Sequence, residues 1–162
     1  MLIPFTDLPD DSRIWIYQSN RKFTDEEVVE LQSKLDDFLK QWTAHGANLQ
    51  AGGEIKYNYF IVIGLDQIKN AASGCSIDAQ VHFIQQLEKQ LDVELLDKMN
   101  VTYIQNDRVH HKALLDFKKM VKEGAVGKST VVFNNLVNTK EEYLESWEVP
   151  AIESWHSRFF KK

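Results

Sequence analysis

A capped amphipathic helix is the feature that most constrains the fold of this chain. Thr24 and Glu27 have the spacing of a capping box, and Phe23 and Val28 stand where a hydrophobic staple would form. The pattern predicts a helix over residues 25–43 that packs on one face. Its apolar positions recur at helical spacing, at Val28, Leu31, Leu35, Phe38, Leu39 and Trp42.

Segments typical of strands and further helices follow one another along the rest of the chain. Alternating or continuous apolar residues predict strands, and 3.6-residue periodicity predicts helices. Asn106 and Asp107 form a polar break of the kind that closes a hairpin. The expected strands are 13–19, 55–65, 101–105, 108–111 and 130–133; helices are expected from Ile77 to near Asp92 and from Leu114 to Val121, with a loop over 66–78.

This order predicts an α+β protein. We expect a single sheet, mixed or antiparallel, that is covered by helices, and a ferredoxin-like arrangement is one form it can take. With 162 residues, no repeat and no linker, the sequence predicts one globular domain over residues 1–162.

Composition and charge exclude several function classes as first expectations. A formal charge of −5 disfavours broad adhesion to nucleic acid or to anionic membranes, which both require a basic surface. The lysines at 112, 118, 119, 122 and 128 cluster in sequence, but such residues are usually solvating groups of helix ends. No signal-like or membrane-spanning stretch is evident and the single cysteine cannot form an internal disulfide, so we expect a cytoplasmic protein.

The segment from Ser73 to Asp78 is the strongest candidate for a functional site. It places Cys75 just ahead of the second helix, where unpaired N–H groups and the helix dipole favour anions and lower a thiol pKa. Gly74 permits an unusual backbone turn, and the hydroxyls of Ser73 and Ser76 would point into one concavity with the amides. The leading hypothesis is a site for a small anionic ligand or metabolite.

A thiol enzyme is the alternative interpretation of the same segment. Cys75 would be the nucleophile, His45 its base and Asp78 the group that orients the histidine, provided that the loops holding them share one edge of the sheet. Free cysteines are among the most buried residues, so a purely structural segment is a third interpretation. In it Cys75 is buried, Ser73 or Ser76 caps the helix, and His45 closes the first helix. None of the three requires a cofactor.

Two further motifs do not support a nucleotide or metal site. Residues 127–130 resemble the end of a Walker A loop, but the earlier glycine position holds Lys122 and the segment runs into a strand rather than a helix. Asp78 and His82 lie one helical turn apart, a spacing that more often gives a solvated contact than a metal site. We therefore expect neither ATP hydrolysis nor a bound metal.

Aromatic residues gather near the C-terminus, at Trp147, Trp155, Phe159 and Phe160. A terminal helix that docks on the core explains them without a partner. Any part left exposed would instead favour a homodimer, or a structural or interaction protein, as the third function class.

Four segments resemble an uncharacterised family of small bacterial proteins over nearly the whole chain: residues 42–46, 57–61, 73–78 and 154–156. Members of that family are often labelled as ABC transporter ATPases, but this chain has no complete Walker A, Walker B or signature motif, so the resemblance implies no ATPase mechanism and no catalytic residues. Residues 13–65 also resemble small ferredoxin-like dimeric barrel proteins in the order of their elements, a likeness that implies fold and not function.

Overall fold

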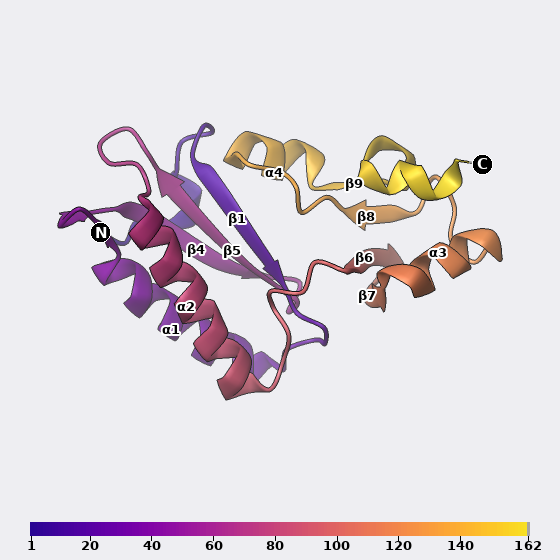
Figure 1. Ribbon diagram of the computed structural model, residues 1–162, viewed down its shortest axis with the longest axis horizontal. Helices are drawn as coiled ribbons and strands as arrows, with labels where there is room; N and C mark the ends of the chain where they lie inside the picture. Colours follow the sequence, from indigo (N-terminus) through magenta and orange to yellow (C-terminus); the bar gives the residue numbers. More distant parts are fainter. Residues whose placement is uncertain (162) are drawn as a thin grey trace. The chain divides into compact units, whose positions relative to one another are not determined.

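The computed structural model describes residues 1–161 and divides into two compact units (Figure 1). Unit 1 comprises Met1–Leu96 together with Asn138–Glu141, and unit 2 comprises Asp97–Val137 and the chain from Glu142 onward. The single domain over residues 1–162 stays a prediction beside this division.

Unit 1 is built on a three-stranded antiparallel sheet with the order β1-β5-β4. β1 (Arg13–Gln18) and β4 (Gln50–Lys56) both pair antiparallel with the central β5 (Phe60–Asp66), so they are parallel to each other across it. α1 (Asp25–Gln41) connects them, which gives the split β-α-β unit of ferredoxin-like folds. On the outer edge of β1, in place of a fourth strand, is a single bridge from Arg13 to Thr139.

The predicted strand over residues 55–65 is in fact two strands and a tight turn. A three-residue turn, Tyr57–Tyr59, connects β4 to β5, and its first two residues, Tyr57 and Asn58, have left-handed φ values of 55° and 56°. The continuous apolar run of β5 reflects its central position, where both faces are buried.

Both long helices cover one face of this sheet (Figure 1). α1 begins with the predicted capping box, in which Thr24 accepts a hydrogen bond from the backbone N–H of Glu27 and Glu27 accepts one from that of Thr24. α2 (Gly74–Leu91) lies beside it, and the rings of Phe38 and Phe83 stack between them at 4.5 Å. The buried core joins both helices to the strands, with Leu31, Leu35, Leu39, Ile61, Ile63, Leu65, Ile84 and Leu87 at its centre.

A small hairpin follows α1. β2 (Thr43–Ala44) and β3 (Ala47–Asn48) pair around a turn made by His45 and Gly46, whose φ values are 50° and 78°. The helix expected to reach residue 43 therefore ends at Gln41, and His45 does not close it.

Unit 2 contains a four-stranded antiparallel sheet with the order β7-β6-β8-β9. β6 (Asn100–Gln105) and β7 (Arg108–Ala113) form the predicted hairpin, and Asn106 and Asp107 make its turn at φ values of 55° and 60°. β8 (Val131–Phe133) and β9 (Glu148–Pro150) complete the sheet.

The helices of unit 2 are short. α3 (Leu114–Lys122) packs against β6 and β7 around the buried Phe117. α4 (Lys140–Ser146) lies between β8 and β9 in sequence, and its first two residues belong to unit 1. The short segments η1 (Phe5–Asp7) in unit 1 and η2 (Ala151–Glu153) and η3 (Trp155–Phe160) in unit 2 are 3-10 helices.

The α+β class and the antiparallel pairing are confirmed. The expectation of a single sheet is corrected, because the strands are divided among a three-stranded, a two-stranded and a four-stranded sheet, and each unit builds a sheet over its own core. The likeness to dimeric barrel proteins does not extend to a barrel, since the larger sheets are open.

Candidate functional site

Three segments of unit 1 meet where α2 begins. Trp42, the C-cap of α1, donates its indole N–H to the carbonyl of Ser76 at 2.8 Å. Asn70, in the loop before α2, donates from its side chain to the carbonyl of Asn48 on β3 at 3.2 Å. The candidate segment Ser73–Asp78 is therefore anchored to the end of α1 and to the β2–β3 hairpin.

The hydroxyls of Ser73 and Ser76 cap the helix. Ser73 is the N-cap and accepts from the backbone N–H of Ser76 at 3.1 Å, and the Ser76 hydroxyl accepts from the N–H of Ser73 at 2.7 Å. Ser76 is 2% exposed, and its hydroxyl also donates to the carbonyl of Ser73 at 2.8 Å. The Ser76 hydroxyl therefore does not line an open concavity, because a Ser at the third helical position completes a reciprocal cap, while a ligand-binding role of Ser73 stays a prediction.

Gly74 and Cys75 are the exposed part of the segment. They occupy the first two helical positions, where backbone N–H groups have no partner inside a helix. Neither amide forms a hydrogen bond within residues 1–161, and a Cβ built on Gly74 would meet no atom within 4 Å. Gly74 is helical rather than left-handed, so the unusual turn expected at this glycine is absent and α2 begins four residues earlier than residue 78.

The three residues of the hypothetical thiol site are all exposed. Cys75 is a free, exposed thiol, Asp78 is exposed on α2, and His45 is exposed at the tip of the β2–β3 hairpin. In the described part of the chain no hydrogen bond or ion pair links any two of them. The hairpin does lie against α2, so the fold brings these residues to one end of unit 1 without assembling a triad.

A buried polar pair that the sequence did not reveal lies deeper on α2. Tyr17 on β1 donates a hydrogen bond to the side-chain carbonyl of Gln80, which is fully buried. Burial raises the pKa of Tyr17 to about 12. The side-chain N–H₂ of Gln80 has no hydrogen-bond partner in residues 1–161.

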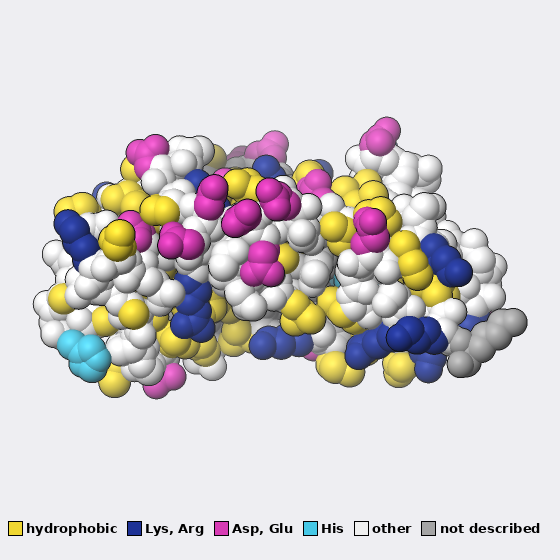
Figure 2. Space-filling view, turned by 90° about the horizontal axis from the view of Figure 1, so that it is seen from above, with side chains coloured by type: hydrophobic (Ala, Val, Ile, Leu, Met, Phe, Trp, Pro, Cys, Tyr) yellow, Lys and Arg dark blue, Asp and Glu magenta, His cyan; other side chains and the backbone are white. Residues whose placement is uncertain are grey.

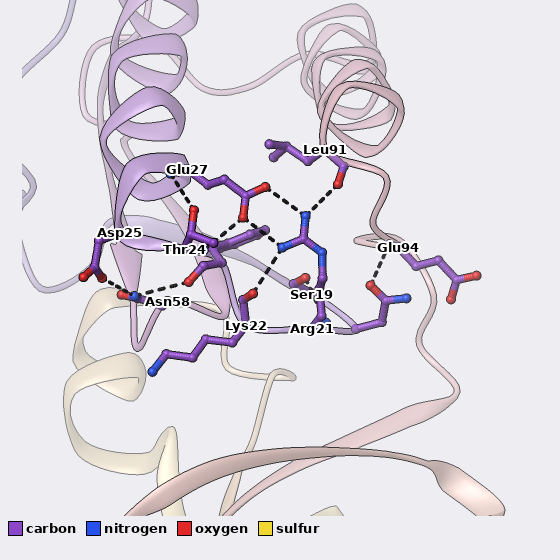
Figure 3. Close-up of polar contacts among 11 residues, drawn as sticks. Ser19, Arg21, Lys22, Thr24, Asp25, Glu27, Asn58, Leu91 and Glu94 are labelled. Carbon is purple, nitrogen blue, oxygen red and sulfur yellow. Dashed lines mark hydrogen bonds and ion pairs between the residues drawn. The ribbon is translucent and has the colours of Figure 1, made fainter.

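At the opposite end of unit 1, a polar network joins the other helix ends (Figure 3). Arg21 forms a bidentate ion pair with Glu27, with both N···O distances 2.8 Å, and donates to the carbonyl of Leu91 at the end of α2 at 2.7 Å. Asn58 in the β4–β5 turn donates to the carboxylate of Asp25 at 3.0 Å. Because the charges of Arg21, Glu27 and Asp25 are all paired inside the protein, this network is structural.

Unit 2 contains a serine and a histidine in contact. The Ser154 hydroxyl lies 2.5 Å from Nδ1 of His156, which is fully buried beneath Trp155 at a ring distance of 3.8 Å. Burial and then the nearby Arg158 charge lower the pKa of His156 to about 3. Such a histidine is a poor base, and the pair serves as the N-cap of η3.

The remaining motifs have simple local structures. Residues 127–130 form a turn ahead of β8, in which Gly127 N–H donates to the Thr130 hydroxyl at 2.8 Å. His82 contacts Gln86 at 3.3 Å on an exposed helix face. Within residues 1–161, no three His, Cys, Asp or Glu side chains are grouped to hold a metal ion, and none of the helices combines the length and hydrophobicity of a bilayer crossing.

Scans against protein-family models, curated proteins and solved structures find no match to this chain.

Proposed function

We propose that the protein binds a small anionic ligand, such as a carboxylate or phosphate compound, at the N-terminus of α2. The observation that carries the proposal is the pair of exposed amides at Gly74 and Cys75, beside open space, on a long helix whose serine cap is already complete. Helix N-termini attract anions because their N–H groups are unpaired and the dipole is positive there.

A cation at the same end of unit 1 supports the proposal. Tyr17 on β1 donates a hydrogen bond to Gln80, in the second turn of α2. Trp15, two residues earlier on β1, packs edge-on at 5.8 Å against Trp42, which bonds to Ser76 in the first turn of α2. The beginning of β1 therefore lies toward the N-terminus of α2. Arg13 begins the strand on the same face, with its guanidinium 4.4 Å from the centre of the Trp15 ring. Stacking on the indole holds this charge at the end of the unit that contains the site.

Phosphate titration followed by NMR tests the amide site. Inorganic phosphate should shift the backbone signals of Gly74 and Cys75 in a saturable manner. Gly74→Pro should weaken binding, since proline is tolerated at the first helical position but has no N–H. Gly74→Ala keeps the amide and is the matched control. Equal affinity in the proline and alanine variants would exclude the amide site, and loss of affinity in Arg13→Gln would show that the arginine contributes.

A thiol enzyme remains the second candidate, favoured by the exposure of Cys75 at the helix start. The rate of Cys75 alkylation, measured against pH, decides it: half-maximal rate well below pH 8.5 favours an activated thiol. Measuring the same pH dependence in His45→Gln tests whether His45 changes the reactivity of the Cys75 thiol. A free thiol also fits the reducing, cytoplasmic location that we propose with either function.

The contacts of the C-terminal aromatic residues give less support to the third function class, a structural or interaction protein. Trp147 is 3% exposed and packs on Phe133, while Trp155, Phe159 and Phe160 pack half-buried on the core of unit 2. The homodimer stays a prediction, which concentration-dependent size measurement of the protein tests.

A further inference from the structure

β7 is the terminal strand of the unit 2 sheet, and among residues 1–161 it pairs with β6 alone. Asn106 and Asp107 form a two-residue turn, so Arg108 and every second residue after it bond toward β6. The backbone N–H and C=O groups of Val109 and the N–H of Ala113, whose own C=O begins α3, point to the open edge. An unpaired edge is a template for another extended chain.

The surface beside this edge is basic. Unit 2 contains ten Lys and Arg residues against eight Asp and Glu residues, whereas unit 1 contains nine against sixteen. Residues 108–123 alone carry five of the unit 2 cations and two carboxylates, those of Asp116 and Glu123. Figure 2 shows several Lys and Arg side chains toward the right-hand end of the face that it draws, where unit 2 is drawn in Figure 1.

Both β7 and the helix α3 that packs against it carry exposed cations. Arg108 and Lys112 pair with Gln105 and Val101, on the sheet face that α3 covers. α3 exposes Lys118 and Lys122, neither of which has an ion-pair partner in the described chain, while Lys119 lies 3.9 Å from Glu123. We call Arg108, Lys112, Lys118 and Lys122 the basic surface.

We propose that the open edge of β7 and the basic surface form a docking site for an extended acidic peptide segment of a partner protein. The peptide backbone pairs with the outward groups of β7, and its carboxylates, on alternate residues of the added strand, meet the cations of the basic surface. A peptide fits this site better than a nucleic acid because the edge offers backbone donors and acceptors in the spacing of a strand. Because this surface is basic, charge complementarity favours a negatively charged partner.

Fluorescence anisotropy with a labelled peptide of alternating Glu and Thr tests the docking site on the full chain. The acidic peptide should bind, a Lys and Thr peptide should not, and affinity should fall as salt increases. The double variant Arg108→Glu with Lys112→Glu should weaken binding at least about tenfold. The control is the double variant Lys69→Glu with Lys89→Glu, which makes the same charge change at exposed residues of unit 1 and should leave binding unchanged.

Strand pairing is separated from simple charge attraction by two changes. Val109→Pro removes an outward N–H, which edge strands tolerate because the bonds to β6 are kept. It should weaken binding, as should methylation of alternate peptide nitrogens. If the proline variant does not fold, hydrogen exchange of the Val109 and Ala113 amides replaces it, and the acidic peptide should slow both.

Several results would overturn the proposal. The first is that the acidic peptide does not bind, and the second is that the methylated peptide binds equally well. The third is that a thymidine oligonucleotide binds more tightly and displaces the peptide. The fourth is a dimer of this chain that occupies the edge and is lost in Val109→Pro.

Discussion

The guanidinium of Arg21 and the carboxylate of Glu27 face each other through two hydrogen bonds of 2.8 Å, and the same guanidinium reaches the end of α2 (Figure 3). The hydrogen bonds from Arg21, followed by that from the Thr24 N–H, lower the pKa of Glu27 to about 2. A depressed carboxyl pKa stabilises the fold above the unfolded value of 4.5, and this contribution is lost as pH falls from 4.5 toward 2.

We therefore expect Glu27→Gln to lower the free energy of unfolding at pH 7 by about 1–2 kcal/mol, a modest value because the pair is partly exposed. Urea unfolding at pH 7 and at pH 2.5 measures the effect, which should largely disappear at the lower pH. Glu26→Gln, on the same helical turn and exposed, should change little. An equal loss in both variants would show that general helix charge, and not this pair, is responsible.

His156 gives unit 2 a stability that depends on pH in the mildly acidic range. Its pKa is about 3 in the folded protein and near 6.5 in the unfolded chain, so only the unfolded chain takes up the proton as pH falls below 6.5. The contribution of His156 to the free energy of unfolding should be complete above pH 6.5. From this residue alone, the free energy of unfolding should decrease by about 2 kcal/mol between pH 6.5 and pH 5.

Denaturation of wild type and His156→Gln across this pH range measures that slope, with tryptophan fluorescence as the probe because Trp155 stacks on the histidine. The variant should have a lower free energy of unfolding than the wild type at pH 7.5, and its free energy of unfolding should change less with pH. His82→Gln, at an exposed position, should keep the wild-type slope. Parallel curves for wild type and His156→Gln would mean that the buried histidine is protonated in the fold.

Local sequence signals predicted the elements better than their assembly. The capping box of Thr24 and Glu27 and the Asn106–Asp107 turn are short-range features, and both form as expected. The turn at Tyr57 was missed because tyrosine is an unusual residue at positive φ, so the apolar run on both sides was interpreted as one strand. The division into three sheets depends on long-range pairing that a single sequence does not display.

The segment of the candidate site does begin a helix, but the serine hydroxyls that were expected to bind a ligand form the helix cap. Serine at both Ser73 and Ser76 predicts a reciprocal cap as well as it predicts an anion cradle, and packing against Trp42 favours the cap by burying Ser76. The pairing of Tyr17 with Gln80 joins residues 63 positions apart and has no local signal. The approach of His45 to Cys75 likewise depended on the hairpin after α1, which the sequence did not predict.

Close approach of the N-terminal segment requires glycine in β4. Gly52 pairs with Gly64 on β5, and a Cβ on Gly52 would lie 2.5 Å from the carbonyl oxygen of Ile3. Gly52→Ala should therefore displace residues 1–5 or strain the sheet and lower the free energy of unfolding by about 1–3 kcal/mol. Chemical denaturation measures this, with Gly74→Ala as the control because its Cβ meets open space. Similar stability of the two variants would show that the N-terminal segment does not pack against β4 in solution.

The end of α2 offers a stabilising substitution. Asp92 is the C-cap, with φ 53° and ψ 55°, and it places a carboxylate at the negative end of the helix dipole. Glycine adopts this conformation without strain, so Asp92→Gly should raise the free energy of unfolding by about 1 kcal/mol. Asp92→Asn removes only the charge and should give roughly half of that gain.

The opposing effect is the attraction between Asp92 and the Arg21 charge, which weakens with distance and salt. Thermal and urea unfolding of the two variants at low and high salt separate these contributions, and a loss of stability in both variants at low salt would show that the attraction to Arg21 outweighs the strain and the dipole.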